Sequence, residues 1–410
     1  MKRSLLALIA VVAVLGVYRV SAAPRAPHSA LSVYVTGDPA PIETLRRGVV
    51  TAVRALLPPA PHAQMELFWV NPSFAPLPAG RSVTMNAGFL IAAPGRPPLS
   101  FAMPVTLTNT PLNWRPAHEL LVSDDPETID KSGVLNAMTI QPSQAVRLLY
   151  HHQNGSRDRD MAFAVKLTNP GPFAATLLVT AADGGPTPNE LLAGHTAARW
   201  FLSQYWHHAG FLLVLPSMTS FVLSEATVPP QDVVSGVDQI ALQSGRSVRL
   251  EVVSTFPDGS ERISLREGAQ FELEPSWPGF LNPVIFRVTS YTVGNVATLT
   301  FGGPDDLLHA QEAGTTLLGN YGVIYSFAVA MANPTAGPMR AVLVMHADSG
   351  QAQGTFLVDG HVVEGPIVQP NAPRVITTFD LPPLSRRVVE LSTMPESGSC
   401  YPVWLTIGPR

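Results

Sequence analysis

Four aromatic residues gather in one short stretch of this 410-residue chain, at Trp200, Phe201, Tyr205 and Trp206. Aromatic faces stack on sugar rings and anchor protein partners, so this group is the candidate binding site. Their spacing is also typical of the apolar side of a helix, in which case the rings would cover a core or a sheet edge. Both interpretations stay open from the sequence.

The 11 histidines raise the question of a metal site. His151–His152 and His207–His208 are adjacent pairs, but neighbours on a strand point to opposite faces, so at most one of each pair could join a site. The acidic stretch 123–127 (SDDPE) is typical of the start of a short helix, and no calcium-loop or Cys-x-x-Cys pattern occurs. We therefore predict loop or surface histidines, no metal site and no cofactor.

Catalytic patterns are missing as well. The G-x-S-x-G turn, the phosphate loop and the dinucleotide fingerprint do not occur. Because triads can assemble from distant positions, this argues against an enzyme without disproving one. The one cysteine, Cys400, has no histidine after it. We expect it to be a small buried residue near the last strand.

Residues 1–22 have the pattern of a signal peptide. Lys2 and Arg3 precede an apolar stretch from Leu5 to Val17, and small residues follow at Val20–Ala22. That stretch is shorter than the roughly 20 residues needed to cross a bilayer. We predict a protein with no membrane span after signal cleavage that is secreted, periplasmic or on the cell surface.

The composition restricts the class of protein. Hydrophobic residues make up 46% of the chain, enough for packed cores, whereas 40 prolines and 31 glycines favour short strands joined by turns. Charged residues are only 14%, and the net charge is −4. A mildly acidic, unclustered charge argues against nucleic acid as a partner.

Residues 28–110 are predicted to form a small α+β domain. Apolar residues recur at spacings of three and four between Pro41 and Leu57, which indicates an amphipathic helix. Short apolar or alternating runs indicate strands at Leu31–Thr36, Met65–Val70, Val83–Ala92 and Leu99–Thr108. A second helix is possible at 196–208, over the aromatic group.

The rest of the chain contains an internal recurrence. Phe163-Ala164-Val165 followed by Asn169-Pro170 returns as Phe327-Ala328-Val329 followed by Asn333-Pro334. Further matches pair Gly194-His195 with Gly360-His361, Leu215-Pro216 with Leu381-Pro382, and Val237 with Val403. The matches fall on turn residues and alternating apolar positions, where a fold constrains sequence most. Chance recurrence between two β-rich segments is the alternative.

We therefore predict a mainly β chain with two tandem homologous β-sandwich units, at 111–243 and 318–410. The stretch 244–317 is a β-rich spacer or supplies extra strands to the second unit. In style, the repeated strand and its Asn-Pro turn are similar to immunoglobulin-like modules of bacterial surface proteins.

These observations favour a non-catalytic extracytoplasmic protein that serves adhesion, envelope organisation or partner binding. The alternative is a polysaccharide-binding or polysaccharide-processing protein that uses Trp200, Tyr205 and Trp206. In either case the expected partner is a protein or polysaccharide of the cell envelope.

Overall fold

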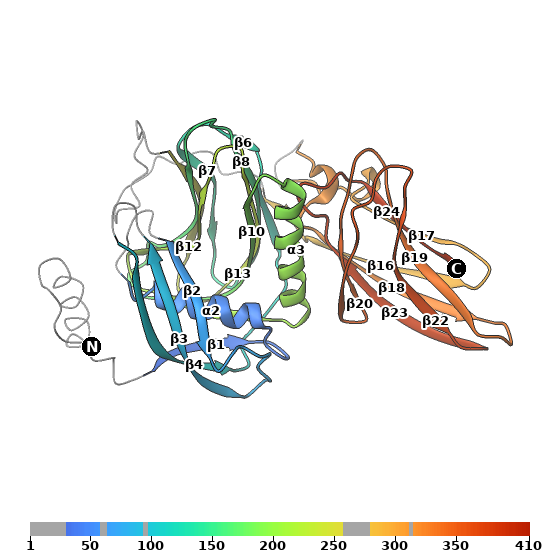
Figure 1. Cartoon of the computed structure of the whole chain (residues 1–410), viewed down its shortest axis with the longest axis horizontal. Coiled ribbons are helices and arrows are strands. Elements are labelled where there is room, and N and C mark those ends of the chain that lie inside the picture. Colours follow the sequence, from blue (N-terminus) through green and yellow to red (C-terminus); the bar gives the residue numbers. More distant parts are fainter. Residues whose placement is uncertain (1–29, 58–63, 93–96, 257–278, 311–314) are drawn as a thin grey trace, which may run out of the picture.

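The computed structural model describes residues 30–57, 64–92, 97–256, 279–310 and 315–410, so the predicted signal peptide lies outside the described residues. The chain is mainly β, as predicted, with 57% strand and 10% helix. Its strands form several sheets in a larger N-terminal lobe and a smaller C-terminal lobe (Figure 1).

The segment 30–109 contains the predicted helix and the four predicted strands. They are β1 (Leu31–Thr36), α2 (Ile42–Arg54), β2 (Gln64–Asn71), β3 (Ser82–Ala92) and β4 (Leu99–Asn109). Leu45, Val49 and Val53 are the apolar positions that α2 buries. β1 pairs with β4 on one side and with β11 (Gly210–Leu215) on the other. This segment therefore extends a sheet of the first sandwich.

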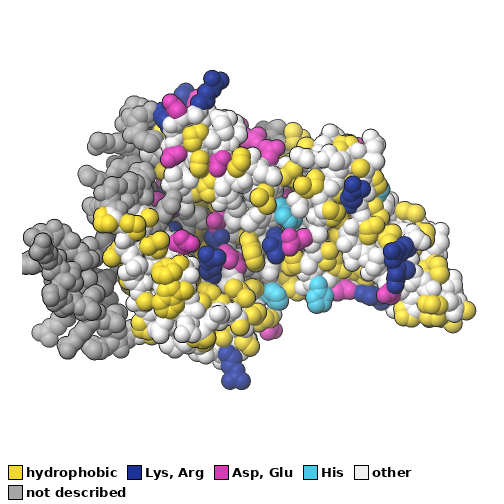
Figure 2. Space-filling model, viewed as in Figure 1, with side chains coloured by type: hydrophobic (Ala, Val, Ile, Leu, Met, Phe, Trp, Pro, Cys, Tyr) yellow, Lys and Arg dark blue, Asp and Glu magenta, His cyan; other side chains and the backbone are white. Residues whose placement is uncertain are grey.

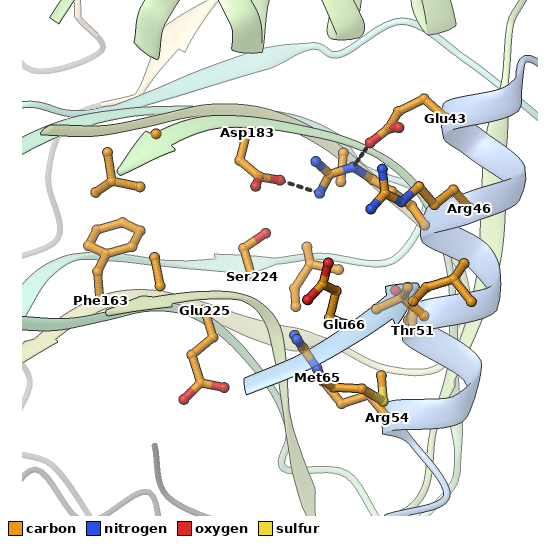
Figure 3. Close-up of a pocket in the computed structure, with 18 of the residues that line it drawn as sticks. Glu43, Arg46, Thr51, Arg54, Met65, Glu66, Phe163, Asp183, Ser224 and Glu225 are labelled. Carbon is orange, nitrogen blue, oxygen red and sulfur yellow. Dashed lines mark hydrogen bonds and ion pairs between the residues drawn. The ribbon is translucent and has the colours of Figure 1, made fainter. Parts of the chain in front are cut away.

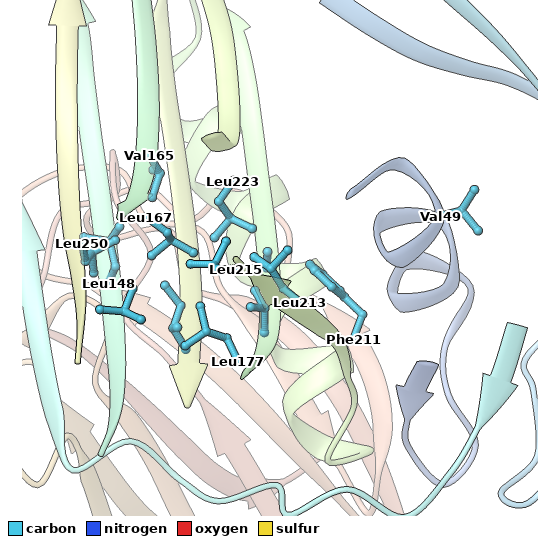
Figure 4. Close-up of a cluster of buried hydrophobic side chains, with 14 of the residues drawn as sticks. Val49, Leu148, Val165, Leu167, Leu177, Phe211, Leu213, Leu215, Leu223 and Leu250 are labelled. Atoms are coloured by element: carbon cyan, nitrogen blue, oxygen red, sulfur yellow. The ribbon is translucent and has the colours of Figure 1, made fainter. Parts of the chain in front are cut away.

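The first sandwich follows. Besides β11, its strands are β5 (Glu119–Ser123), β6 (Thr128–Ile129), β7 (Gly133–Ile140), β8 (Ala145–Asn154), β9 (Met161–Asn169), β10 (Ala175–Thr187), β12 (Thr219–Val228), β13 (Val233–Ser244) and β14 (Val248–Thr255). One sheet begins with the short β15 (Phe280–Leu281) and runs β15-β5-β8-β13-β10-β11-β1-β4-β3-β2, with β6 beside β8. The other sheet runs β12-β9-β14-β7. Alternate residues of both sheets fill one apolar core, which includes Val49 of α2 (Figure 4).

The second sandwich has a sheet β16-β18-β23-β20-β21 and a sheet β17-β24-β19-β22. Its elements, together with the short β15, are β15 (Phe280–Leu281), β16 (Val284–Thr292), β17 (Ala297–Phe301), η1 (Pro304–Asp306), η2 (Leu318–Asn320), β18 (Ile324–Asn333), β19 (Met339–Ala347), β20 (Thr355–Val358), β21 (His361–Glu364), β22 (Arg374–Leu381), β23 (Ser385–Thr393) and β24 (Val403–Pro409). The stretch 244–317 thus supplies β14 to the first sandwich and β16 and β17 to the second.

Helix α3 (Glu190–Trp206) lies between the two lobes (Figure 1). It begins six residues before the predicted 196–208, because the Asn189 side chain accepts a hydrogen bond from the Leu192 amide and caps it. Phe201 and Leu202 belong to the same apolar cluster as the interior of the second sandwich. The lobes are therefore joined by a continuous core.

Both Asn-Pro motifs make the same backbone connections. In each, the asparagine Nδ2 donates to three carbonyls, two of which belong to the matched Leu-Pro pair. The acceptors are Phe173, Leu215 and Pro216 for Asn169 and Gly337, Leu381 and Pro382 for Asn333. Each asparagine also begins a turn, since its Oδ1 accepts from the amide two residues later.

Two of the other sequence matches do not hold in the structure. Gly194 lies inside α3, whereas Gly360 has a φ of +80° in the turn between β20 and β21. Asp183 of β10 pairs with Gly236 of β13, and the equivalent residue of the second sandwich, Ala347 of β19, pairs with Val403 of β24. Val403 therefore matches Gly236 and not Val237. Val237 is therefore one residue out of register with Val403 and faces the other side of its sheet, because strand side chains alternate.

Candidate functional site

A cavity of about 610 Å³ lies where α2, the edge strand β2 and its neighbour β3 meet the first sandwich. Helix α2 forms one wall, and β10 and β12 form the opposite side (Figure 3). Thr44 at the start of α2 donates a 2.9 Å hydrogen bond to Gln204 of α3, which ties the two helices together. On the face seen in Figure 2, acidic and basic side chains lie next to one another over this part of the larger lobe.

Arg47 spans one end of the cavity. Its Nε donates to Glu43 Oε1 at 2.8 Å, one helical turn back, and its Nη1 pairs with Asp183 of β10 (Figure 3). Burial alone would lower the pKa of Arg47, but the charges of Asp183 and Glu43 outweigh it and raise the pKa. This arginine is held in place as a fixed positive charge.

A second charged group faces the same space. Arg54, from the last turn of α2, points towards the side where Glu66 of β2 and Glu225 of β12 lie (Figure 3). Burial lowers the pKa of Arg54, and Glu225 only partly offsets this. With Arg46, the walls carry three arginines and four carboxylates, so donors and acceptors of charge-assisted hydrogen bonds are nearly balanced.

The sandwich contributes polar as well as apolar side chains to the cavity lining. Tyr150 of β8 and Ser224 of β12 both line the cavity. Asp238 of β13 is fully buried behind them. Burial raises the pKa of Asp238 to about 7, with Arg47 opposing the rise and Asp183 adding to it. Burial raises the pKa of Tyr150 too, and the nearby charges of Asp238 and Asp183 add to the rise.

The four predicted aromatic residues do not form one platform. Trp200 lines the cavity. Phe201 is fully buried, and Tyr205 lies 5.5 Å from the buried Arg147 guanidinium at the lobe interface. Trp206 packs so closely over Gly360 of the second sandwich that a Cβ there would lie 2.8 Å from its Nε1. Of the four rings only Phe201 is buried, and the other three are half-buried and pack against the apolar cluster of the second sandwich.

The prediction of loop or surface histidines is wrong for three of them. His151 and His152 lie in β8 on opposite faces, as strand geometry requires, but they are only 5% and 0% exposed. Burial lowers the pKa of each to about 4. His195 is buried in α3, where its Nδ1 lies 2.8 Å from Glu396 Oε2.

Two further expectations also differ. Cys400 is exposed and not buried, and it lies three residues before β24. The acidic stretch 123–127 forms the end of β5 and a bend, and not the start of a helix. The Glu127 backbone carbonyl accepts from the Gln153 amide at 2.7 Å, which holds it beside β8.

Sequence reasoning missed the cavity because its residues come from six or more elements. On an amphipathic helix the charged residues opposite the apolar positions are expected to face solvent, so Arg47 and Arg54 do not by themselves indicate a site. The available signal was their seven-residue spacing, which places both on one side of α2, opposite the apolar positions.

No protein-family model and no curated protein matches the chain. Among solved structures, similarities include the M60 catalytic domain with the CBM51-1 and CBM51-2 domains from Clostridium perfringens ZmpB, at 6% identity, with 84% of this chain and 43% of that chain covered and a TM-score of 0.15. Tripeptidyl peptidase 2 is 10% identical over 80% of this chain and 32% of its own length, with a TM-score of 0.18.

Carbohydrate-binding modules from the β-sandwich superfamily are 9% identical over 42% of this chain and 74% of their own, with a TM-score of 0.13. The chain thus spans less than half the length of the first two structures. At these TM-scores the likenesses carry no argument about function. None of the helices within the described residues has the length and apolar character that crossing a membrane requires.

Proposed function

We propose that the chain is a non-catalytic extracytoplasmic binding protein that holds a hydroxyl-rich ligand, such as a short segment of an envelope polysaccharide, in the cavity beside α2. The observation that carries this proposal is the near balance of three arginines and four carboxylates on the cavity walls. A positively charged ligand would be repelled by the three arginines, and a negatively charged one by the four carboxylates. Hydroxyl groups can both donate to carboxylates and accept from guanidinium groups.

Trp200 supports the same ligand class. It lines the cavity, and an aromatic face there can stack on a sugar ring. The extracytoplasmic location rests on the pattern of residues 1–22. A protein partner for adhesion or envelope organisation is the other candidate, and it would engage an exposed surface larger than this cavity.

We also infer that the two sandwiches arose by duplication of one immunoglobulin-like unit. The support is that four strands have the same spatial order, β11-β10-β13-β8 in one and β22-β19-β24-β17 in the other. The Asn169 and Asn333 connections add a second line of support. Comparing the urea unfolding of Asn169→Ala and Asn333→Ala tests whether these connections are equivalent.

A glycan array followed by titration calorimetry tests the ligand. We expect the intact protein to retain one class of glycan and Arg54→Ala to weaken binding at least about tenfold, since a charge-assisted hydrogen bond contributes about 1.5–3 kcal/mol. Trp200→Ala should also weaken it. Trp206→Ala and the exposed Arg374→Ala should bind like the unaltered protein. Retention of no glycan would contradict the ligand class, and unchanged binding by Arg54→Ala would contradict the site.

A further inference from the structure

His151 is buried without a hydrogen-bond partner. It lies on the face of β8 that points away from the first core, and it is 5% exposed. Among the described residues, neither Nδ1 nor Nε2 forms a hydrogen bond. Leaving a buried polar group unsatisfied costs about 1–3 kcal/mol, and no residue in the described part of the chain gives this ring a hydrogen bond.

Two carboxylates converge on this ring. Glu127 and Glu190 each offer an oxygen, and these oxygens and a ring nitrogen of His151 all lie within 4.8 Å of one another. His151 Nε2 is 3.9 Å from Glu127 Oε1. Within the described part of the chain, neither glutamate forms an ion pair with a lysine or arginine. Two like charges thus lie beside the His151 imidazole, and no lysine or arginine of the described residues pairs with either of them.

Backbone contacts hold the three residues together. Glu127 is fixed beside β8 because its carbonyl accepts from the Gln153 amide and the next two residues form β6, which pairs with β8. Glu190 is the first residue of α3, whose start is fixed by the Asn189 cap. A Cβ on Gly398 would lie 2.6 Å from the Glu190 carbonyl, so a loop of the second sandwich packs against this helix end.

We propose that Glu127, His151 and Glu190 form a binding site for a divalent transition-metal cation, with Zn²⁺ as the best match. Imidazole suits Zn²⁺, whereas Ca²⁺ and Mg²⁺ prefer oxygen ligands alone. The cation would neutralise the two glutamates and give His151 its missing partner. Three protein ligands leave a fourth position of a tetrahedral Zn²⁺ for water or an outside group.

This site is separate from the cavity beside α2, and it links the 124–127 bend to α3 at the junction of the two lobes. Its occupation should therefore stabilise that junction. Loss of a residue that only supports a metal ligand usually lowers metal affinity by about tenfold or more. Loss of one of the three ligands themselves should lower the Zn²⁺ affinity by at least as much.

The test uses the full chain after chelator treatment and dialysis, titrated with ZnSO₄ by calorimetry. We expect one Zn²⁺ per chain and a higher melting temperature in its presence. Glu190→Gln and Glu127→Gln, both of exposed residues, should each weaken binding at least about tenfold. Co²⁺ substitution should give visible absorption bands that His151→Asn abolishes. His361→Ala, a matched change of an exposed histidine, should leave binding unchanged.

Two results would overturn the proposal. One is a titration of the unaltered protein without saturable binding. The other is a Glu190→Gln variant that binds Zn²⁺ as tightly as the unaltered protein, because the cation would then be held elsewhere.

Discussion

The two sandwiches use matching ladders but fill one end differently. Positions in the two sandwiches can be matched by setting Asn169 equivalent to Asn333 and following the strand pairings from there. By this matching, five residues at or near the cavity of the first sandwich correspond to apolar residues in the core of the second. The pairs are Tyr150 with Phe301, Asp183 with Ala347, Ser224 with Val389, Gly236 with Val403, and Asp238 with Leu405. One framework can therefore either close over an apolar core or support a polar cavity, depending on a few side chains.

The largest change in stability should come from replacing Asp238. Its pKa is raised to about 7 by burial, from an ordinary value of 3.8. Between these two values the folded state holds a proton that the unfolded state has lost, so stability falls as pH rises and the cost is complete above pH 7. We expect Asp238→Asn to raise the free energy of unfolding by up to about 4 kcal/mol at pH 8 and by little at pH 4.

Urea unfolding at both pH values measures this difference. Asp380→Asn on β22 is the control, because that carboxylate is exposed and should show no comparable change between pH 4 and pH 8. A gain from Asp238→Asn that is equal at the two pH values would mean that ionisation of the buried acid is not its cause.

The next largest change in stability should come from replacing Asn169 or Asn333, and it should be similar in the two sandwiches. Asn169→Ala and Asn333→Ala each remove three hydrogen bonds from a buried amide, and each leaves carbonyls without a donor. We expect each variant to lose about 3 kcal/mol of stability, since such a bond contributes about 1 kcal/mol net. Denaturant midpoints followed by intrinsic fluorescence measure this. A large loss for one variant and none for the other would show that the two connections are not equivalent.

A smaller effect should appear where α3 meets the second sandwich. Burial alone would lower the pKa of His195, but its contacts with Glu396 and Glu364 raise it above the usual 6.5. A raised histidine pKa contributes stability that is complete below the unfolded value and is lost as pH rises through the folded value. The second sandwich should thus be held more firmly at pH 6 than at pH 8. Thermal unfolding of His195→Asn should lack this pH difference, and its persistence would exclude His195 as the source.

Local elements could be predicted from the sequence because their signals are local. Alternation and helical spacing located β1 and α2 to within a few residues. The pairing of β1 with β11 could not be predicted, because the residues of a strand do not indicate which distant strand it pairs with, here about 180 positions away.

The candidate site was hidden for the same reason. Arg54 and Glu66 are unremarkable surface residues until α2 and β2 bring them to one cavity. His151 was correctly placed opposite His152, yet its burial depends on the bend and helix end that cover the outer face of β8.

Replacing polar residues of the first cavity with their counterparts from the second core tests most directly whether the cavity binds a glycan. Tyr150→Phe and Ser224→Val replace two polar lining residues with the matching side chains of the second sandwich. Glycan binding by calorimetry should then fall at least about tenfold while the melting temperature is kept or raised. Undiminished binding by this folded double variant would mean that the glycan is not held by the polar residues of this cavity.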